Sequence, residues 1–141
     1  MLNGKMFQPI LAATFVAASA FAATAADHGA LSEDKFITDS LVAAGVGDVI
    51  RKECPNISAR LFVVWGKTRE LERYALGLGY TEKQIRAFIG DKSERARIRQ
   101  NVVTYLMENG VKKGNKDSFC ALGQAEIKNK TIAGSLLRSR Q

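Results

Sequence analysis

The N-terminal segment constrains this chain most, because it decides how much of the chain folds and in which redox compartment. Lys5 gives the segment a positive start, and Met6–Ala23 is a small, apolar stretch rich in Ala, Phe and Val. Ala23-Thr24-Ala25 then forms a cleavage signal of the A-x-A type. We expect residues 1–25 to be a signal peptide that is cleaved near Ala25 or Ala26, which would place the mature protein in the periplasm. An uncleaved anchor fits less well, since the stretch is Ala-rich and ends in a processing signal instead of flanking charge.

The remainder, residues 26–141, is one domain's worth of chain and can bury one modest hydrophobic core. It contains no repeat, no low-complexity tract and no linker long enough to divide domains. We therefore expect a single domain.

Both cysteines, Cys54 and Cys120, lie in this remainder and enclose 65 residues (55–119). In an oxidising compartment an even pair most simply forms one disulfide. On the loop-entropy model such a closure is worth roughly 4 kcal/mol, a large share of a small domain's stability. A redox-active pair is the alternative, but the spacing is not the C-x-x-C that such a role favours.

Helical patterns dominate the remainder, and strand patterns are nearly absent. Ser32 can cap a first helix, which Gly45 and Gly47 are expected to interrupt before Pro55-Asn56 ends a short turn from Asp48. Capping boxes at Thr81 and Asp91 and a cap at Asp117 predict three later helices. Gly79 and Gly110 are typical C-terminal helix stops. The predicted fold is all-α, a small domain of five or six helices closed by one disulfide.

The strongest helical pattern opens at Ser58 and continues to Leu78. Its apolar residues recur at helical spacing, at Leu61, Val64, Trp65, Leu71, Ala75 and Leu78. Phe62 and Val63 add apolar groups off this stripe, so the first half of the helix is expected to be buried nearly all round. The sequence leaves open whether that excess belongs to the core or to an interface. Gly66 inside the helix costs about 1 kcal/mol relative to Ala, which either close packing or a kink would explain.

The chain carries 21 basic and 14 acidic residues, and the excess lies at the C-terminal end. From Gly110 to Gln141 only Asp117 and Glu126 are acidic. The basic residues of that stretch are Lys112, Lys113, Lys116, Lys128, Lys130, Arg138 and Arg140. This asymmetry favours an anionic partner such as lipid, lipopolysaccharide, cell-wall polymer or an acidic protein face, and nucleic acid is not expected outside the cytoplasm. Alternatively, the charge merely keeps a small protein soluble.

A second basic feature is a ridge of Lys92, Arg95 and Arg99 at i, i+3 and i+7 of one predicted helix. Lys112, Lys113 and Lys116 follow the end of that helix, so the two groups could form one cationic surface. A solvated helix face is the simpler interpretation, because Arg and Lys populate exposed faces by default.

Residues typical of catalysis or metal binding are sparse. The only histidine, His28, lies two residues after the predicted cleavage site, and no C-x-x-C-H, Gly-rich phosphate loop or zinc spacing occurs. Glu70 and Glu72 stand at i, i+2 and point apart on a helix. Glu126 is the acid in the basic C-terminal stretch, and we expect it in a partly buried salt bridge. The sequence therefore predicts no catalytic residues, no metal and no cofactor.

Several motifs together resemble one known family. They include Ile50-Arg51-x-x-Cys54, Leu78-Gly79-Tyr80, Phe119-Cys120-Ala121-Leu122-Gly123 and Gly134-Ser135-Leu136-Leu137-Arg138. This set resembles an alphaproteobacterial family of small exported proteins, known as domain of unknown function 5333. One departure is Phe119, where the family pattern leads us to expect Tyr. The resemblance implies a periplasmic location and supplies no activity, substrate or site residues.

These observations favour a non-enzymatic periplasmic protein that binds a complex of the cell envelope or an anionic membrane or cell-wall surface. The contacts are expected at Lys92, Arg95, Arg99, Lys112, Lys113, Lys116, Lys128, Lys130 and Arg138. The alternative is a periplasmic stress chaperone, which would expose apolar surface at low pH. With a single histidine in the chain, its acid switch would have to rest on carboxylates. An envelope-acting enzyme is the third hypothesis, and the sequence leaves the oligomeric state open.

Overall fold

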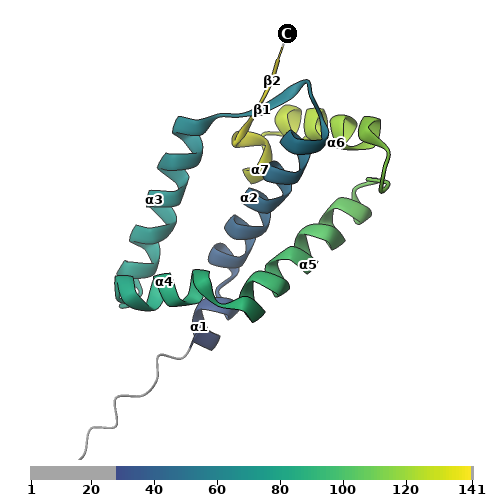
Figure 1. Cartoon of the computed structure of the whole chain (residues 1–141). Helices are drawn as coiled ribbons and strands as arrows, with labels where there is room; N and C mark the ends of the chain where they lie inside the picture. The colour runs from purple at the N-terminus through teal and green to yellow at the C-terminus, as the bar shows by residue number, and fades with distance from the viewer. Residues whose placement is uncertain (1–27, 141) are drawn as a thin grey trace, which may run out of the picture.

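A computed structural model describes residues 28–140 of the chain, and the predicted signal peptide lies outside these described residues. In chain order the helices are α1 (His28–Glu33), α2 (Lys35–Glu53), α3 (Leu61–Gly77), α4 (Glu82–Gly90), α5 (Lys92–Glu108), α6 (Lys116–Asn129) and α7 (Ile132–Ser135). Two short strands, β1 (Ile57–Ala59) and β2 (Leu137–Ser139), complete the described part. In Figure 1, α2 runs through the middle of the molecule, α3 lies to one side and α5 to the other.

The central helix α2 is continuous, which corrects two expectations. Its N-cap is Asp34, whose side chain accepts a hydrogen bond from the Ile37 amide, and Ser32 belongs to the preceding helix α1. The helix also passes through Gly45 and Gly47 without interruption. A Cβ at Gly45 would lie 2.6 Å from Cγ2 of Val102, so this glycine lets α5 approach α2 closely. Packing against α5 therefore outweighs the poor helix propensity of glycine.

After α2 the chain forms a strand, where the sequence pattern led us to expect the start of a helix at Ser58. Ser58 lies in the middle of β1, and α3 begins only at Leu61. β1 pairs antiparallel with β2, with Ser58 opposite Arg138. The Arg140 amide extends this ribbon by donating to the Asn56 carbonyl at 2.7 Å. The two-stranded ribbon thus ties the C-terminal segment to the N-terminal end of α3. This pairing joins segments far apart in sequence, so no local sequence pattern predicts it.

The expected stops and caps between α3 and α5 are present. Gly79 has a φ of 93°, and the Tyr80 and Gly79 amides donate back to the carbonyls of Ala75 and Leu76. This is the Schellman arrangement that glycine favours. Thr81 forms the predicted capping box with Gln84, and Asp91 caps α5 by accepting from the Glu94 amide at 2.9 Å. These signals depend on local chain chemistry, which is why the sequence predicts them well.

The cap of α6 differs from the prediction. Asn115 is its N-cap and accepts a hydrogen bond from the Ser118 amide, whereas Asp117 lies within the first turn. Lys130 ends the helix in the left-handed conformation, with a φ of 52°. Thr131 then caps the short helix α7 by accepting from the Gly134 amide at 2.9 Å.

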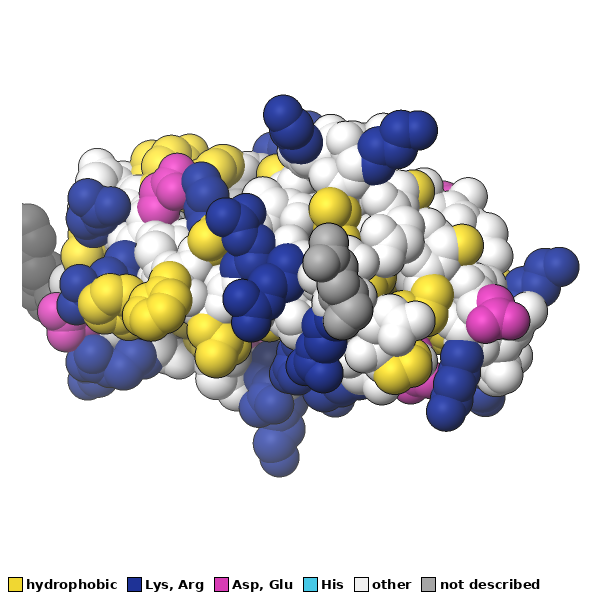
Figure 2. Space-filling model, turned by 90° about the horizontal axis from the view of Figure 1, so that it is seen from above, with side chains coloured by type: hydrophobic (Ala, Val, Ile, Leu, Met, Phe, Trp, Pro, Cys, Tyr) yellow, Lys and Arg dark blue, Asp and Glu magenta, His cyan; other side chains and the backbone are white. Residues whose placement is uncertain are grey.

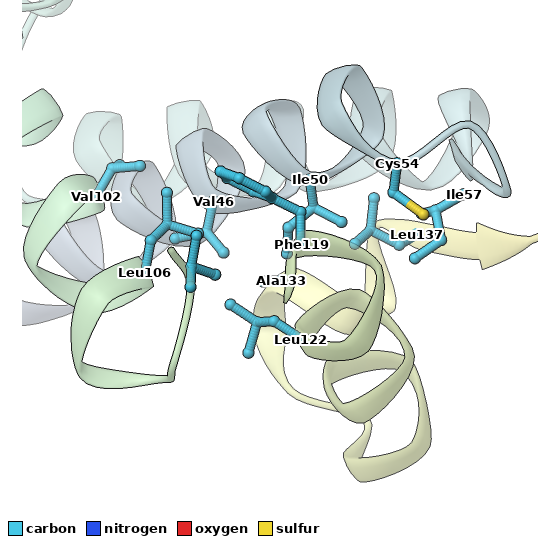
Figure 3. Close-up of a cluster of buried hydrophobic side chains, with 11 residues drawn as sticks. Val46, Ile50, Cys54, Ile57, Val102, Leu106, Phe119, Leu122, Ala133 and Leu137 are labelled. Atoms are coloured by element: carbon cyan, nitrogen blue, oxygen red, sulfur yellow. The ribbon is translucent and has the colours of Figure 1, made fainter. Parts of the chain in front are cut away.

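The main core surrounds α2, and Figure 3 shows how side chains from α2, β1, α5, α6, α7 and β2 meet there. Ile50, Cys54 and Val46 of α2 are nearly fully buried. They pack with Ile57, Val102, Leu106, Val111, Phe119, Leu122, Ala133 and Leu137. The predicted disulfide is present, with the sulfur atoms of Cys54 and Cys120 1.99 Å apart, and it joins the end of α2 to α6.

The structure confirms a small, mostly helical, disulfide-closed fold. Seven helices are present among residues 28–140, where five or six were predicted. The six-residue helix α1 and the four-residue helix α7 account for the difference. Leu31 in α1 is buried and anchors a second, smaller core with Ile37, Ala75, Ile85 and Phe88.

Candidate functional site

The N-terminal half of α3 is exposed, which corrects the expectation that it is buried nearly all round. Leu61 is 73% exposed, Phe62 is 91% exposed and Trp65 is 59% exposed. Ala75, near the other end, is the one residue of α3 that is fully buried. We call the surface formed by Leu61, Phe62 and Trp65 the α3 tip. An apolar cluster of this kind marks an interaction site more often than a scattered exposed side chain does.

The α3 helix has apolar residues on two faces. This explains why the sequence pattern wrongly predicted that its first half is buried nearly all round. Val64, Leu71 and Ala75 face the groove between α2 and α3. Phe62, Trp65 and Leu76 recur on a second stripe, and all three are exposed. Arg69 lies on that stripe, with its guanidinium 4.2 Å from the centroid of the Trp65 ring. Such a stacked arginine keeps its charge at the surface beside the aromatic face.

Two arginines border the α3 tip, Arg60 and Arg69, and two more lie in the C-terminal segment that pairs with β1. From Arg60 to Arg69 the chain has three basic residues and no acidic one, and β2 adds Arg138 with Arg140 directly after it. The Arg60 amide donates to the Leu136 carbonyl at 2.8 Å, and Nε of Arg138 donates to Oγ of Ser58 at 3.1 Å. We call the exposed side chains Arg60, Arg69, Arg138 and Arg140 the basic flank. Seen from above in Figure 2, Lys and Arg side chains spread across this end of the molecule, and hydrophobic side chains gather on the side of α3.

An apolar groove of about 630 Å³ lies between α2 and α3. Figure 1 shows α4 crossing one end of these helices and α7 near the other end of α2. The lining includes Leu41, Leu71, Ile85, Phe88, Ile132 and Leu136. Charged side chains occur only among the residues that rim it: Lys67, Glu70, Glu72, Glu82, Arg86 and Lys130. We call this cavity the α2–α3 groove.

The end of the groove near α1 is closed by a contact between α3 and α2. The rings of Phe36 and Tyr74 meet edge to face with centroids 4.6 Å apart. The Tyr74 hydroxyl donates to Asp34 at 3.0 Å, and this hydrogen bond to a carboxylate raises the pKa of Tyr74. The splayed helix α3 is therefore held at both ends, by this contact and by the ribbon.

The basic residues singled out from the sequence are all exposed, but they lie on separate elements. Lys92, Arg95 and Arg99 line α5, and Lys112, Lys113 and Lys116 follow in the loop and the start of α6. Lys128 and Lys130 are at the end of α6, and Arg138 is in β2. The structure places Arg138 opposite Ser58, three residues before the α3 tip, and Lys130 at the rim of the groove. Binding at any of them remains a prediction.

Glu126 does not form the expected salt bridge within the described part of the chain. It is 4% exposed and accepts hydrogen bonds from two hydroxyls, those of Tyr105, at 2.6 Å, and Thr131. Burial, and then the bond to Glu126, raises the pKa of Tyr105 to about 12, so the phenol stays protonated and donates. We call these three residues the Glu126 cluster. It links α5, α6 and the start of α7.

Three further structural facts concern the described residues. Within residues 28–140, Asp48 of α2 is the one acid that forms ion pairs with two cations, Arg51 and Lys52. Burial opposes ionisation of Asp48, but the hydrogen bonds from Lys52 and Arg51 outweigh it and lower the pKa of that carboxyl. Across residues 28–140, no helix is both long and apolar enough to cross a bilayer. In the same part of the chain no group of three or more His, Cys, Asp or Glu side chains is arranged to hold a metal ion.

Comparison with known proteins identifies the family. Residues 29–138 match a family described as a family of unknown function, DUF5333. The chain belongs to this family. No curated protein and no solved structure matches the chain. Family membership therefore carries no activity or partner, and the functional argument depends on the surface just described.

The sequence does not single out Arg60 and Arg69 as candidate binding residues, and its pattern assigns Leu61 and Trp65 to the buried stripe. It leaves Phe62 open between core and interface, and the structure shows that Phe62 is exposed. The second helical stripe of Phe62, Trp65 and Leu76 could have indicated an exposed apolar face. An amphipathic helix that packs on a single core needs only one apolar stripe. The link from Arg138 to this tip had no such signal, since it depends on the pairing of β1 with β2.

Proposed function

We propose that this protein is a non-enzymatic accessory protein of the cell envelope that docks on an anionic membrane surface through the α3 tip. The observation that carries the proposal is the exposure of Leu61, Phe62 and Trp65 beside Arg60 and Arg69. Arg138 and Arg140 add two exposed cations on the adjoining ribbon. Amphipathic surfaces of this composition, with Trp, Phe and Leu next to cations, are typical of proteins that lie in the membrane interface.

The apolar part of the tip supplies one share of the binding free energy. Each such side chain gains about 1.5–3 kcal/mol when it is fully removed from water. The helix end that carries them is fixed by the ribbon, so Leu61 and Phe62 follow directly from an ordered Arg60. Insertion of these side chains into the interface would therefore cost little additional ordering of the backbone.

The basic flank supplies the other share. Near an anionic bilayer each Lys or Arg contributes about 1 kcal/mol, and salt screens this attraction. Arg60 directly precedes α3, Arg69 lies in α3, and Arg138 and Arg140 lie in and just after β2. No acid occurs from Arg60 to Arg69 or from Leu137 to Arg140. Reversible, salt-sensitive binding is the expected behaviour.

An envelope protein complex is the competing partner for the same tip. A stable protein interface buries about 800 Å² on each partner. Three side chains of this size, at about 150–250 Å² for each aromatic, cover less than that. The small apolar area and the exposed arginines near it therefore favour a lipid surface over a folded partner.

The cellular setting is part of the proposal. The A-x-A signal at Ala23-Thr24-Ala25 and the disulfide support export to the periplasm, and the motif resemblance supports an alphaproteobacterial origin. N-terminal sequencing of protein recovered from the periplasm tests the first point. A mature chain that begins near Ala26 is expected, and an intact N-terminus would contradict cleavage.

The membrane proposal is tested by co-sedimentation of the purified, disulfide-intact protein with vesicles of phosphatidylglycerol and phosphatidylcholine. The protein is expected to bind the anionic vesicles and to be released as salt is raised. Replacing Leu61 and Phe62 by Ser, or Arg69 and Arg138 by Gln, is expected to weaken binding by about tenfold or more. These side chains are exposed, so the variants are expected to fold.

Matched controls lie on α5. Val103 and Met107 are exposed apolar residues, and Arg95 and Arg99 are exposed basic residues of the ridge singled out from the sequence. The corresponding Ser and Gln variants are expected to bind anionic vesicles like the unaltered protein. Equal losses in the α5 and α3 variants, or no vesicle binding at all, would contradict docking through the α3 tip.

A periplasmic stress chaperone is the second candidate, and the exposed apolar side chains of α3 favour it. A chaperone would suppress aggregation of unfolded clients, and its activity at low pH would depend on carboxylates. Suppression of client aggregation without vesicle binding would replace the membrane proposal with this one.

A further inference from the structure

The α2–α3 groove has the dimensions of a binding site for one narrow apolar ligand. On α2 its lining extends from Phe36 to Ala44, about 12 Å at 1.5 Å per residue. Its volume, about 630 Å³, lies within the range of small-ligand sites. A cavity this large is unusual beside the well-packed interior expected of a small domain.

The lining and the length of the groove indicate the kind of occupant. An extended hydrocarbon chain is narrow and apolar throughout, so it matches an apolar groove of this length. The second core borders this space, and Leu31, Ile37, Ile85 and Phe88 contribute apolar atoms to its lining.

The charges at the rim indicate where a polar end would lie. Lys67 forms an ion pair with Glu70, and Arg86 forms one with Glu82. Among the described residues, this leaves Lys130 as the cation of the rim that has no ion pair. Lys130 lies at the α7 end, while Glu72 and Glu82 belong to α3 and α4. An anionic group is therefore favoured at the α7 end and disfavoured near α4.

We propose that the α2–α3 groove binds the acyl chain of a single-chain anionic amphiphile, a fatty acid or a lysophospholipid, with its anionic group beside Lys130. The apolar lining would enclose the chain, and burial of each methylene would contribute about 0.8 kcal/mol. This site goes beyond membrane docking and uses other residues, so either activity can fail without the other.

The test is a fluorescence titration of the purified, disulfide-intact protein with a dansyl-labelled undecanoic acid. Saturable binding to one site is expected, with competition by decanoate. A parallel competition with lysophosphatidylglycerol distinguishes the sources of the chain: displacement by both assigns the site to acyl chains in general, and displacement by decanoate alone restricts it to fatty acids. Absence of saturable binding would overturn the proposal.

Two variants tie the binding to this groove. Ala44→Phe fills the lining from α2 and is expected to reduce affinity by about tenfold. The matched control is Ala96→Phe on the exposed face of α5, which is expected to bind normally. Lys130→Gln is expected to weaken decanoate by about threefold while leaving decanol unchanged, because the alcohol carries no charge.

Three results would contradict the assignment. They are equal affinity in Ala44→Phe and the unaltered protein, equal losses in Ala44→Phe and Ala96→Phe, and a loss of decanol binding in Lys130→Gln as large as that of decanoate. Circular dichroism and the urea midpoint of each variant separate lost binding from lost folding. The Leu61 and Phe62 variants of the α3 tip are expected to retain acyl-chain binding, which keeps the two tests independent.

Discussion

The Glu126 cluster shows how single residues hold the C-terminal part of the fold. A buried carboxylate is costly unless hydrogen bonds satisfy it, and here the donors are the hydroxyls of Tyr105 and Thr131. Tyr105 comes from α5 and Thr131 precedes α7, so Glu126 connects three helices. The sequence identified Glu126 as an unusual acid but could not name its partners, which lie 21 and 5 positions away.

Tyr105→Phe is therefore expected to destabilise the protein by about 1–3 kcal/mol, because it leaves a buried carboxylate oxygen without its donor. Urea unfolding at neutral pH measures this change. Tyr74→Phe is the matched control. It removes a hydrogen bond to Asp34 from a side chain that is 38% exposed, and is expected to cost less than the Tyr105 change.

Tyr105 also predicts that the stability of the protein depends on pH. The pKa of Tyr105 is raised to about 12 in the folded protein, above the ordinary value near 10. Its contribution to stability is thus fully present below pH 10 and is lost as the pH rises toward 12. The stability advantage of the unaltered protein over Tyr105→Phe should shrink across that interval. An advantage that is constant or grows would contradict the assignment of the raised pKa.

At the scale of the elements, two glycines illustrate opposite demands. Gly66 lies in α3, and no atom lies within 4 Å of the position that its Cβ would take. Close packing therefore does not require a glycine at this position. At Gly134 in α7, a Cβ would collide with the backbone carbonyl of Glu126. The sequence could not distinguish these roles, because both glycines occur within helical patterns.

We expect Gly66→Ala to stabilise the protein by about 0.5–1 kcal/mol, through the better helix propensity of alanine. Gly134→Ala is expected to destabilise it by about 2 kcal/mol or more, because backbone atoms would have to move apart. Thermal or urea unfolding of both variants checks the pair. Stabilisation by Gly134→Ala, or a loss with Gly66→Ala, would show that α7 or α3 packs differently.

Prediction succeeded for elements whose signals are local. The capping box at Thr81 and the glycine stops at Gly79 and Gly110 depend on a few neighbouring residues, and all are present. It failed where distant packing decides. Contact with Val102 keeps α2 helical through Gly45, and pairing with β2 turns Ser58 into a strand residue. The apolar pattern of α3 was detected, but pattern alone cannot say whether an apolar face meets a core or solvent.

At the scale of the whole molecule, the disulfide and the ribbon hold the end of α2, α6 and the C-terminal segment together. The Cys54–Cys120 bond closes the main core, and the fold class could be predicted from cysteine count and helical periodicity. The α3 tip together with its basic flank could not, because Arg138 of the flank reaches β1 only through a contact with Ser58, 80 positions away in sequence. A binding surface assembled from distant segments leaves little trace in a single sequence.

The most direct measurement of the central claim uses Trp65, the only tryptophan of the chain. Trp65 is 59% exposed, so its emission in buffer should be that of a largely hydrated indole. Docking through the α3 tip predicts a blue shift and protection from acrylamide quenching on phosphatidylglycerol vesicles, both reversed by added salt and absent with phosphatidylcholine. An emission spectrum unchanged by anionic vesicles would contradict docking through the α3 tip.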